Sequence, residues 1–408
     1  MTDSDIMQIG IIGIGGHGMG NVYPHIQNNP RMRIRAVCDI IETQLEIGKA
    51  EYDPDYGTTD YTDLLADDGI DAIISSTSDE FHAPIALDCL RGGKDVFIEK
   101  PMGTTLEQCQ ALIRAEKECG KFVMVGVNRR FAPCMIDIRQ ALKEAAIAPE
   151  LQQIGRNAPV IHWSMVDDPR NSSMTIDPLL VGRLNRETCH IFDVTTWLLE
   201  SEPVSIYAVG GNRIDKDTEN RAVVTITYEN GGVASIIMGS ISHISMPKER
   251  MDLWADGLAI RMESFLDVRI ADDDSLAERS YCGFKDGRPG EVKTQAHEEH
   301  RYFRSMQETL KYYVEKGVYS APNTKARIRA WEDLVARGEH KPSDDIVQVP
   351  LDKGHYGEIE AFRQAVLAGG PSPIGATDGT RAFVMGRAAS ESLTSGKPVA
   401  VDRSLYQL

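Results

Sequence analysis

The chain has 408 residues, of which 42% are hydrophobic and 26% are charged, a composition typical of a globular protein with two domains. The formal net charge of -17 argues against binding to nucleic acids or to anionic membranes. The seven cysteines form no Cys-x-x-Cys pair, no apolar run reaches about 18 residues, and the acidic N-terminus lacks a signal-peptide pattern, so we expect a cytoplasmic protein with reduced thiols.

Strands and helices alternate over the first third of the chain. Apolar runs typical of buried strands lie at residues 7–14, 33–40, 70–77, 94–100 and 121–128. Helical patterns lie between them, at residues 17–29, 41–53, 81–93 and 105–120. This alternation predicts βαβ units and therefore an α/β domain with a parallel sheet over residues 1–128.

A glycine-rich turn follows the first strand. Gly13-x-Gly15-x-x-Gly18 opens the first helix, and the second strand ends in Cys38-Asp39, 21 residues after the third glycine. The first glycine permits a tight turn, the second lets backbone approach a pyrophosphate, and the third lets helix and strand pack closely. The spacing predicts a Rossmann-type dinucleotide site whose loop consists of Gly13, Ile14, Gly15, Gly16, His17, Gly18 and Met19.

The end of the second strand indicates which dinucleotide binds. A carboxylate at Asp39 would accept a hydrogen bond from the adenosine ribose 2′-OH and would repel a 2′-phosphate. The next residues are Ile40 and Ile41, so no arginine is present there to hold such a phosphate. The sequence therefore predicts NAD rather than NADP as the cofactor.

The predicted pattern of strands and helices changes after residue 128. Strand-like runs at 203–211, 221–240 and 250–263 follow one another without helices between them, and ENGG at 229–232 is typical of a hairpin turn. Helices are expected at 133–145, 190–200 and 357–370, and a charged helical insert at about 280–345. Residues 129–408 are therefore predicted to form an α+β domain with a largely antiparallel sheet; the family resemblance described below implies that this domain serves substrate binding and oligomer contacts.

The buried strand at 94–100 ends in Glu99-Lys100-Pro101, where charges at a strand end either are simply solvated or belong to a site at the carboxyl edge of the parallel sheet. This motif occurs in order with GIGGHG (13–18), SSTSDEFH (75–82), GVNRRFAP (126–133) and ETCHIFDVTTWL (187–198). Together these segments resemble the GFO/IDH/MocA oxidoreductase family, over residues 6 to about 240 and the helix at 355–369.

The resemblance implies a Rossmann domain followed by an α+β domain with an open sheet. It places Lys100 beside the nicotinamide and the substrate hydroxyl, where an ammonium would stabilise alkoxide character. It gives His190 a catalytic role, and the ordinary pKa of histidine near 6.5 suits proton transfer. Further cofactor contacts are expected from Ser76, Thr77, Ser78, His82, Glu99, Lys100 and Asn128.

One position departs from the family pattern. Many members have Asp four residues before the catalytic histidine, whereas this chain has Arg186 followed by Glu187. Glu187 lies one turn before His190 and is expected to replace the missing carboxylate. Asp193, one turn after His190, is expected either to hold the imidazole ring or to bind backbone of the second domain.

Several residues are candidates for substrate binding. Arg129, Arg183 and Arg186 either bind an anionic substituent, such as a uronate or phosphate, or pair with carboxylates of their own domain. Trp163 either stacks on a sugar face or is a buried core residue. The expected substrate contacts are Lys100, Arg129, Trp163, Arg186 and His190.

These expectations combine into an NAD-dependent oxidoreductase acting on a secondary alcohol of a sugar, glycoside or cyclitol. Two other functions stay open: a glycoside hydrolase or epimerase that keeps NAD bound and returns the hydride, and a non-catalytic NAD or sugar sensor. His297 and His300 share a helix face, but without a third ligand no metal site is expected. The protein is expected to form a homodimer or homotetramer.

Overall fold

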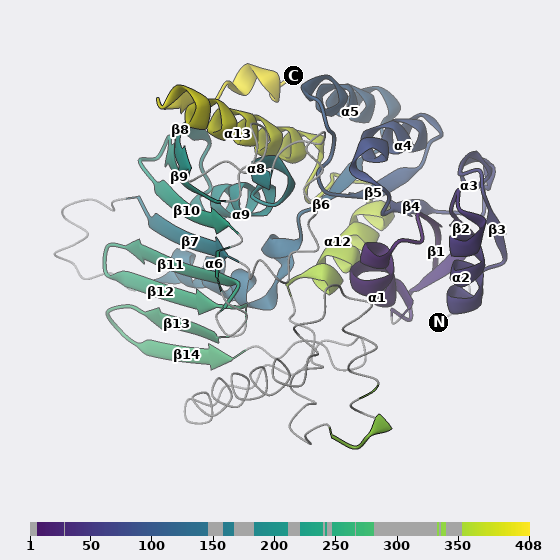
Figure 1. Cartoon of the computed structure of the whole chain (residues 1–408), viewed down its shortest axis with the longest axis horizontal. Helices are drawn as coiled ribbons and strands as arrows, with labels where there is room; N and C mark the ends of the chain where they lie inside the picture. The colour runs from purple at the N-terminus through teal and green to yellow at the C-terminus, as the bar shows by residue number, and fades with distance from the viewer. Residues whose placement is uncertain are drawn as a thin grey trace.

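The computed structural model describes residues 6–27, 29–145, 158–166, 183–210, 221–239, 241–242, 247–265, 267–280, 333, 336–339 and 353–408 (Figure 1). Two sheets, one parallel and one mixed, organise these residues into an N-terminal α/β part and a second α+β part. The insert expected around 280–345, including His297 and His300, lies almost entirely outside the described residues.

The first sheet has six parallel strands in the order β3-β2-β1-β4-β5-β6. Their bounds are β1 Met7–Ile12, β2 Met32–Cys38, β3 Tyr56–Thr58, β4 Ala72–Ser75, β5 Asp95–Glu99 and β6 Val123–Gly126. The order reverses between β1 and β4, and ligands of such sheets bind at the carboxyl edge of that point. The predicted Rossmann-type domain is therefore confirmed.

Helices cover both faces of this sheet, which explains why its strands are apolar throughout. The helices are α1 Tyr23–Gln27, α2 Glu42–Tyr52, α3 Thr62–Ala66, α4 Asp79–Arg91 and α5 Leu106–Cys119. Apolar residues of α4 and α5 pack on one face, while residues of α1, α2 and the C-terminal helix α12 (His355–Ala368) pack on the other. Every residue of β4, β5 and β6 is buried as a result.

The helix predicted at 17–29 is divided in the structure. Gly18–Val22 forms a π-helical turn, labelled η2, and only Tyr23–Gln27 is α-helical. Gly18, Gly20 and Pro24 explain the difference, because glycine is a weak helix former and proline lacks the N–H that an α-helical hydrogen bond needs.

The second sheet has nine strands in the order β14-β13-β12-β11-β7-β10-β9-β8-β15, and only the β7–β10 pair is parallel. The strands are β7 Val160–Val166, β8 Pro203–Gly210, β9 Arg221–Tyr228, β10 Val233–Gly239, β11 Glu249–Ala255, β12 Leu258–Glu263, β13 Asp267–Ala271, β14 Leu276–Ser280 and β15 Val399–Ala400. The predicted hairpin joins β9 to β10. The expected largely antiparallel sheet is confirmed.

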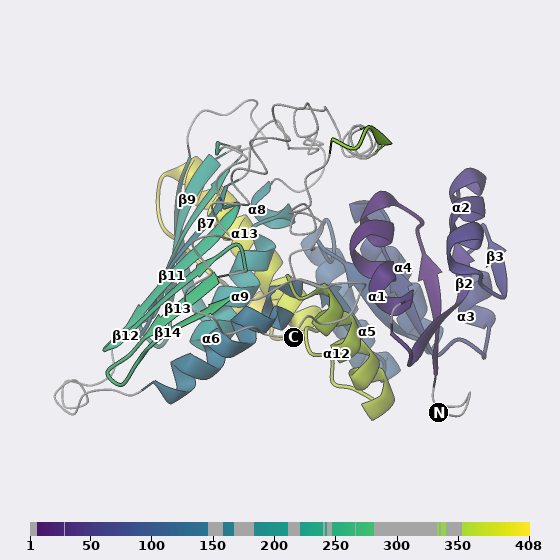
Figure 2. The ribbon, with the colours of Figure 1, turned by 90° about the horizontal axis from the view of Figure 1, so that it is seen from below.

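Helices lie on one face of the second sheet, and its other face carries none of the described helices (Figure 2). They are α6 Pro133–Glu144, α8 Arg183–Arg186, α9 Cys189–Leu199 and α13 Ala376–Ser395. A short 3₁₀ turn, η3 Asn128–Phe131, leads from β6 into α6. Helix α13 contacts both α5 and α9, so it ties the second domain to the first.

Helix α12, which follows strand β14 in the sequence, packs against the Rossmann domain. Phe362 packs edge-on against Phe97 of β5 and Phe122, with ring centroids 6.0 Å apart in both pairs. Gly354 precedes the helix at φ +98°, and a Cβ there would overlap the backbone of Asn128 and Ala132. Only glycine therefore allows this close approach of α12 to η3.

We predict that Gly354→Ala destabilises the protein by about 2–5 kcal/mol, because it adds a backbone clash to the cost of a left-handed alanine. Gly369 at the other end of α12 is a matched control, since its φ is +74° but an added Cβ would meet nothing within 4 Å. Gly369→Ala should cost only about 1–2 kcal/mol. Urea unfolding compares the two variants, and equal losses would contradict the prediction.

Candidate active site

The glycine loop begins directly after β1 and is shaped by contacts beneath it. Gly13 has φ +91°, and a Cβ there would lie 2.5 Å from the carbonyl oxygen of Ser76. The buried hydroxyl of Tyr23 donates to the carbonyl oxygen of Gly13 at 2.5 Å, and Gly18 makes room for this ring. By contrast, a Cβ on Gly15 or Gly16 would meet nothing within 4 Å, so the outer side of the loop is open to a ligand.

The carboxylate of Asp39 also shapes this loop. Its Oδ2 accepts from the backbone N–H of Ile14 at 2.7 Å, and its Oδ1 accepts from that of Ile41 at 2.8 Å. Each carboxylate oxygen has a second lone pair, so Asp39 can still accept from a ribose hydroxyl. Ile40 beside it is 76% exposed and offers an apolar surface.

Two further segments border the loop. Ser76 and Thr77 follow β4, and Ser78 directly precedes α4. The buried ring of His82 lies with Nδ1 2.8 Å from the Pro101 carbonyl oxygen and Nε2 3.2 Å from that of Thr77. His82 therefore connects the segment after β4 with the segment after β5 and positions both.

Glu99 ends β5 and reaches the glycine loop. Its Oε1 lies 3.1 Å from Nε2 of His17, and its Oε2 accepts from the backbone N–H of Lys100 at 3.2 Å. Burial would raise the pKa of Glu99, but the charges of His17 and Lys100 outweigh burial and lower that pKa to about 2. In return, the Glu99 carboxylate raises the pKa of His17.

Lys100 reaches across the boundary between the two domains. Its Nζ donates to Oε1 of Glu187 at 2.8 Å and to the carbonyl oxygen of Arg186 at 3.2 Å. Burial would lower the pKa of Lys100, but the Glu187 carboxylate outweighs it and the pKa is raised, so the side chain is an ammonium. An ammonium has three donors, and these contacts use two of them.

His190 lies in the first turn of α9, one turn after Glu187, and is 5% exposed. Burial lowers the pKa of His190 well below its usual value, and the charges of Arg129 and Lys100 add to this effect. The ring is therefore neutral at neutral pH, which corrects the ordinary pKa assumed from the sequence. Its Nδ1 is buried without a hydrogen-bond partner in the described part of the chain.

Asp193 forms no hydrogen bond with His190 in the described structure. Its Oδ2 accepts from Nε of Arg130 at 2.7 Å, its Oδ1 accepts from Nη2 of the same guanidinium, and Arg130 also pairs with Asp378 of α13 at 3.0 Å. Both expectations for Asp193, as a ring holder and as a backbone ligand, are therefore wrong. A buried carboxylate takes the nearest buried cation, and this one links α9 to η3 and α13.

The arginines expected near the substrate have carboxylate partners. Arg129 is buried and binds both oxygens of Glu249, at 2.8 and 3.3 Å. Nε of Arg186 lies 3.1 Å from Oδ2 of Asp79, which belongs to the Rossmann domain. The Arg183 side chain lies outside the described part of the structure. Arg129 thus pairs with a carboxylate of its own domain, as one of the two expectations had it, whereas the partner of Arg186 belongs to the other domain.

Trp163 lies in the core beneath the site. Its side chain has no exposed surface and packs against Phe265, with ring centroids 6.1 Å apart. The guanidinium of Arg129 lies on the same Phe265 ring, 5.5 Å from its centroid. Of the two readings of Trp163, the buried core residue fits the structure, and stacking on a sugar does not.

The amide of Asn128 is buried and hydrogen-bonded within the protein. Its Nδ2 donates to the carbonyl oxygen of Lys353 at 2.9 Å and lies 3.1 Å from Nε2 of His355, and its Oδ1 accepts from Arg129 at 2.7 Å. The expected contact between this side chain and the cofactor is therefore replaced by a link to α12. Lys353 and His355 were not expected in the site, because neither belongs to one of the short motifs quoted above. The only signal in the sequence is that they lie at the beginning of a predicted helix.

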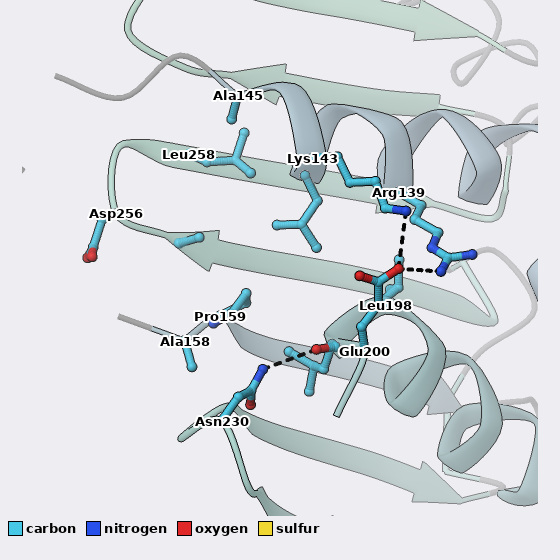
Figure 3. Close-up of a pocket in the computed structure, with 13 residues that line it drawn as sticks. Arg139, Lys143, Ala145, Ala158, Pro159, Leu198, Glu200, Asn230, Asp256 and Leu258 are labelled. Atoms are coloured by element: carbon cyan, nitrogen blue, oxygen red, sulfur yellow. Dashed lines mark hydrogen bonds and ion pairs between the residues drawn. The ribbon is translucent and has the colours of Figure 1, made fainter. Parts of the chain in front are cut away.

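A separate pocket of about 430 Å³ lies at the opposite end of α9 (Figure 3). Arg139 and Lys143 of α6 both pair with Glu200 there, and Leu198 lines it from α9. Ten residues of helix, or about 15 Å, separate Glu200 from His190. This pocket is thus distinct from the site around Lys100.

Comparisons with known proteins agree with this geometry. A family model described as an oxidoreductase family with an NAD-binding Rossmann fold matches residues 7–127, and the GFO/IDH/MocA C-terminal domain matches residues 162–256. Together they cover more than half of the chain, which therefore belongs to the GFO/IDH/MocA oxidoreductase family. Its cofactor is accordingly NAD.

Individual relatives share part of the sequence. The chain is 31% identical over 236 residues to the uncharacterized oxidoreductase YrbE of Bacillus subtilis, covering 56% of this chain and 65% of YrbE. It is 29% identical over 252 residues to the inositol 2-dehydrogenase of Rubrobacter xylanophilus, covering 59% of this chain and 67% of that enzyme. The matched segment thus spans about two thirds of these relatives.

A solved structure extends the similarity of fold to nearly the whole chain. Levoglucosan dehydrogenase in complex with NADH and levoglucosan superposes with a TM-score of 0.71 at 16% identity, covering 97% of this chain and 99% of that chain. Among the described helices of the present chain, none has the length and apolarity needed to cross a membrane.

We predict that Gly15→Ala weakens NAD binding about tenfold or more without changing stability. The added Cβ meets no protein atom within 4 Å and instead enters the open side of the loop. Gly20→Ala is the control, because its Cβ also meets nothing within 4 Å but it lies beyond the glycine fingerprint. Titration of intrinsic fluorescence with NAD gives the affinities; an unchanged affinity in Gly15→Ala would refute the assigned loop.

A second prediction concerns the His17–Glu99 ion pair. Because the folded-state pKa of His17 is raised, its stabilisation is complete below about pH 6.5 and is lost as pH rises through the folded pKa. Wild type should therefore melt at a higher temperature than His17→Gln near about pH 6, and the gap should close near about pH 9. A gap that is constant or that grows with pH would show that no charged pair forms.

Proposed function

We propose that the protein is an NAD-dependent dehydrogenase that oxidises a secondary alcohol of a sugar, glycoside or cyclitol. The observation that carries this proposal is the position of Lys100. Its ammonium lies at the carboxyl edge of the parallel sheet, is held by Glu187 from the second domain, and acts electrostatically on the neutral His190. The names of the relatives, an inositol 2-dehydrogenase and a levoglucosan dehydrogenase, support this substrate class.

The residues present fit a bound dinucleotide. The open side of Gly15 and Gly16 leaves space for a pyrophosphate next to backbone N–H groups, and Asp39 lies where a ribose hydroxyl would donate. Ile40 would cover the adenine side. When bound, the nicotinamide supplies the acceptor for a hydride.

The residues of the chain would manage the hydroxyl proton. Lys100 has a donor left after binding Glu187 and Arg186, and that donor would stabilise negative charge on the alcohol oxygen. His190 is neutral, so a ring nitrogen would accept the proton as general base, although the lowered pKa makes it a weaker base than an ordinary histidine. Glu187 acts on Lys100 rather than on the substrate, since its carboxylate holds the ammonium in place.

The other functions that the sequence left open gain less support. The named relatives are dehydrogenases, so a hydride-returning hydrolase or epimerase is not proposed. A sensor has no need for a charged lysine paired across two domains beside a neutral histidine. A cytoplasmic location stays an expectation from the sequence.

We also propose that the protein is a homo-oligomer, assembled through the second sheet. Apolar side chains are exposed on its strands: Val160, Val204, Tyr207, Val209, Val223 and Trp254. The helices of this domain pack on the opposite face of the sheet, so none of the described helices covers these side chains (Figure 2). An apolar sheet face of this kind is typical of a contact between identical subunits.

The dehydrogenase proposal is tested by adding NAD and a panel of sugars, glycosides and inositols and by following NADH absorbance. We expect NADH with at least one member, and Lys100→Met should lower kcat about 10²- to 10³-fold while changing NAD affinity less than about threefold. Lys49→Met, an exposed lysine on α2, is the control. Unchanged turnover in Lys100→Met would remove Lys100 from the reaction, and NADH formation from no member would count against the dehydrogenase.

A further inference from the structure

One buried carboxylate at the site serves two cations. Glu249 of β11 is 1% exposed, and its Oε1 accepts from Nη2 of Arg129 at 2.8 Å and from Nζ of Lys353 at 3.2 Å. Both cations lie over the ring of Phe265, at 5.5 Å for Arg129 and 5.8 Å for Lys353. The group is therefore compact and carries one more positive than negative charge.

Among the described residues, Glu249 is the only carboxylate that forms an ion pair with Lys353. Lys100 has Glu187, Arg186 has Asp79, and Glu99 has His17 as its own partner. Four cations thus have three carboxylate partners: Glu187 binds Lys100, Asp79 binds Arg186, and Glu249 binds both Arg129 and Lys353.

Lys353 has binding capacity left over. An ammonium has three donors, and within the described chain the Lys353 ammonium makes a single hydrogen bond, to Glu249. Its side chain keeps 21% of its surface exposed. Burial lowers the pKa of Lys353, and the positive charge of Arg129 lowers it further. The carboxylate of Glu249 raises this pKa but does not fully offset the other two effects.

Lys353 lies near the residues proposed to act on the substrate hydroxyl, Lys100 and His190. It directly precedes Gly354 and α12, and its carbonyl oxygen accepts from Asn128 at the end of the Rossmann sheet. Its charge, together with that of Lys100, lowers the pKa of His190. Asn128 follows two residues after Gly126, which pairs with Glu99 of β5, so Lys353 lies at the same edge of the sheet as Lys100 and can bind another substituent of a molecule whose hydroxyl contacts Lys100.

We propose that the substrate carries an anionic group, a carboxylate or a phosphate ester, which binds the free donors of Lys353. This inference rests on the proposed dehydrogenase function and narrows its substrate to acidic sugars and related hydroxy acids. Arg129 is less suited to this task, because its buried guanidinium already donates to both oxygens of Glu249 and to the amide oxygen of Asn128. Lysine is a point charge without a preferred planar partner, so the contact accepts either anion.

The test compares matched ligands that differ in charge. Glucose, glucuronate and glucose 6-phosphate, and the galactose series, are titrated into the enzyme–NADH complex by calorimetry, and NADH formation is followed with NAD in parallel. Wild type should bind the anionic members about tenfold or more tightly than the neutral sugar. Lys353→Met should reduce this ratio about tenfold, and Lys353→Arg should preserve most of it.

Lys397→Met is the control, since Lys397 is exposed beyond the C-terminus of α13. The relative affinities for carboxylate and phosphate then decide between the two anions. If no anionic member binds more tightly than its neutral counterpart, or if Lys353→Met leaves the ratio unchanged, the inference is overturned. NADH formation from neutral sugars alone would then leave the dehydrogenase standing, whereas anion binding without any NADH would keep the Lys353 site and reject the dehydrogenase.

Discussion

The ion pair between Lys100 and Glu187 is the interaction on which the rest of the site depends. Lys100 ends a buried strand of the first domain, and Glu187 precedes the first helix turn that carries His190 in the second. Both side chains are mostly buried, and an unpaired charge there would be strongly unfavourable. The pair therefore fixes the two domains in register and places an ammonium beside an imidazole.

The charges around this pair shift the pKa values of Lys100 and His190 in opposite directions. Lys100 keeps its proton because Glu187 is bound to it, whereas His190 loses its proton because burial and neighbouring cations act against the charged ring. A charged donor and a neutral acceptor result at the same place. This is the combination that removing a proton from an alcohol needs.

The end of the chain completes the site. Helix α12 packs in the core of the Rossmann domain, and the residues just before it reach Asn128 and Glu249. Helix α13 then joins α5 to α9 and supplies Asp378 to Arg130. The proposed active site is thus bordered by segments that lie more than two hundred residues apart in the sequence.

The sequence by itself determined the alternation of strands and helices in the first domain, the glycine loop, the carboxylate of Asp39 and the strand end at Lys100. These follow from local causes: residue periodicity, the backbone freedom of Gly13, and the position of a charge at the end of a buried strand. Membership of the family could be predicted for the same reason, since each motif is a short contiguous segment.

Only the tertiary structure decided which charges pair and which side chains are buried. Asp193 binds Arg130 instead of His190, Trp163 lies in the core, and Lys353 shares Glu249 with Arg129. The pKa of His190 likewise depends on Arg129, a residue distant in sequence. Burial and electrostatic pairing depend on distance in space, and spacing along the chain carries no information about neighbours that folding brings from another domain.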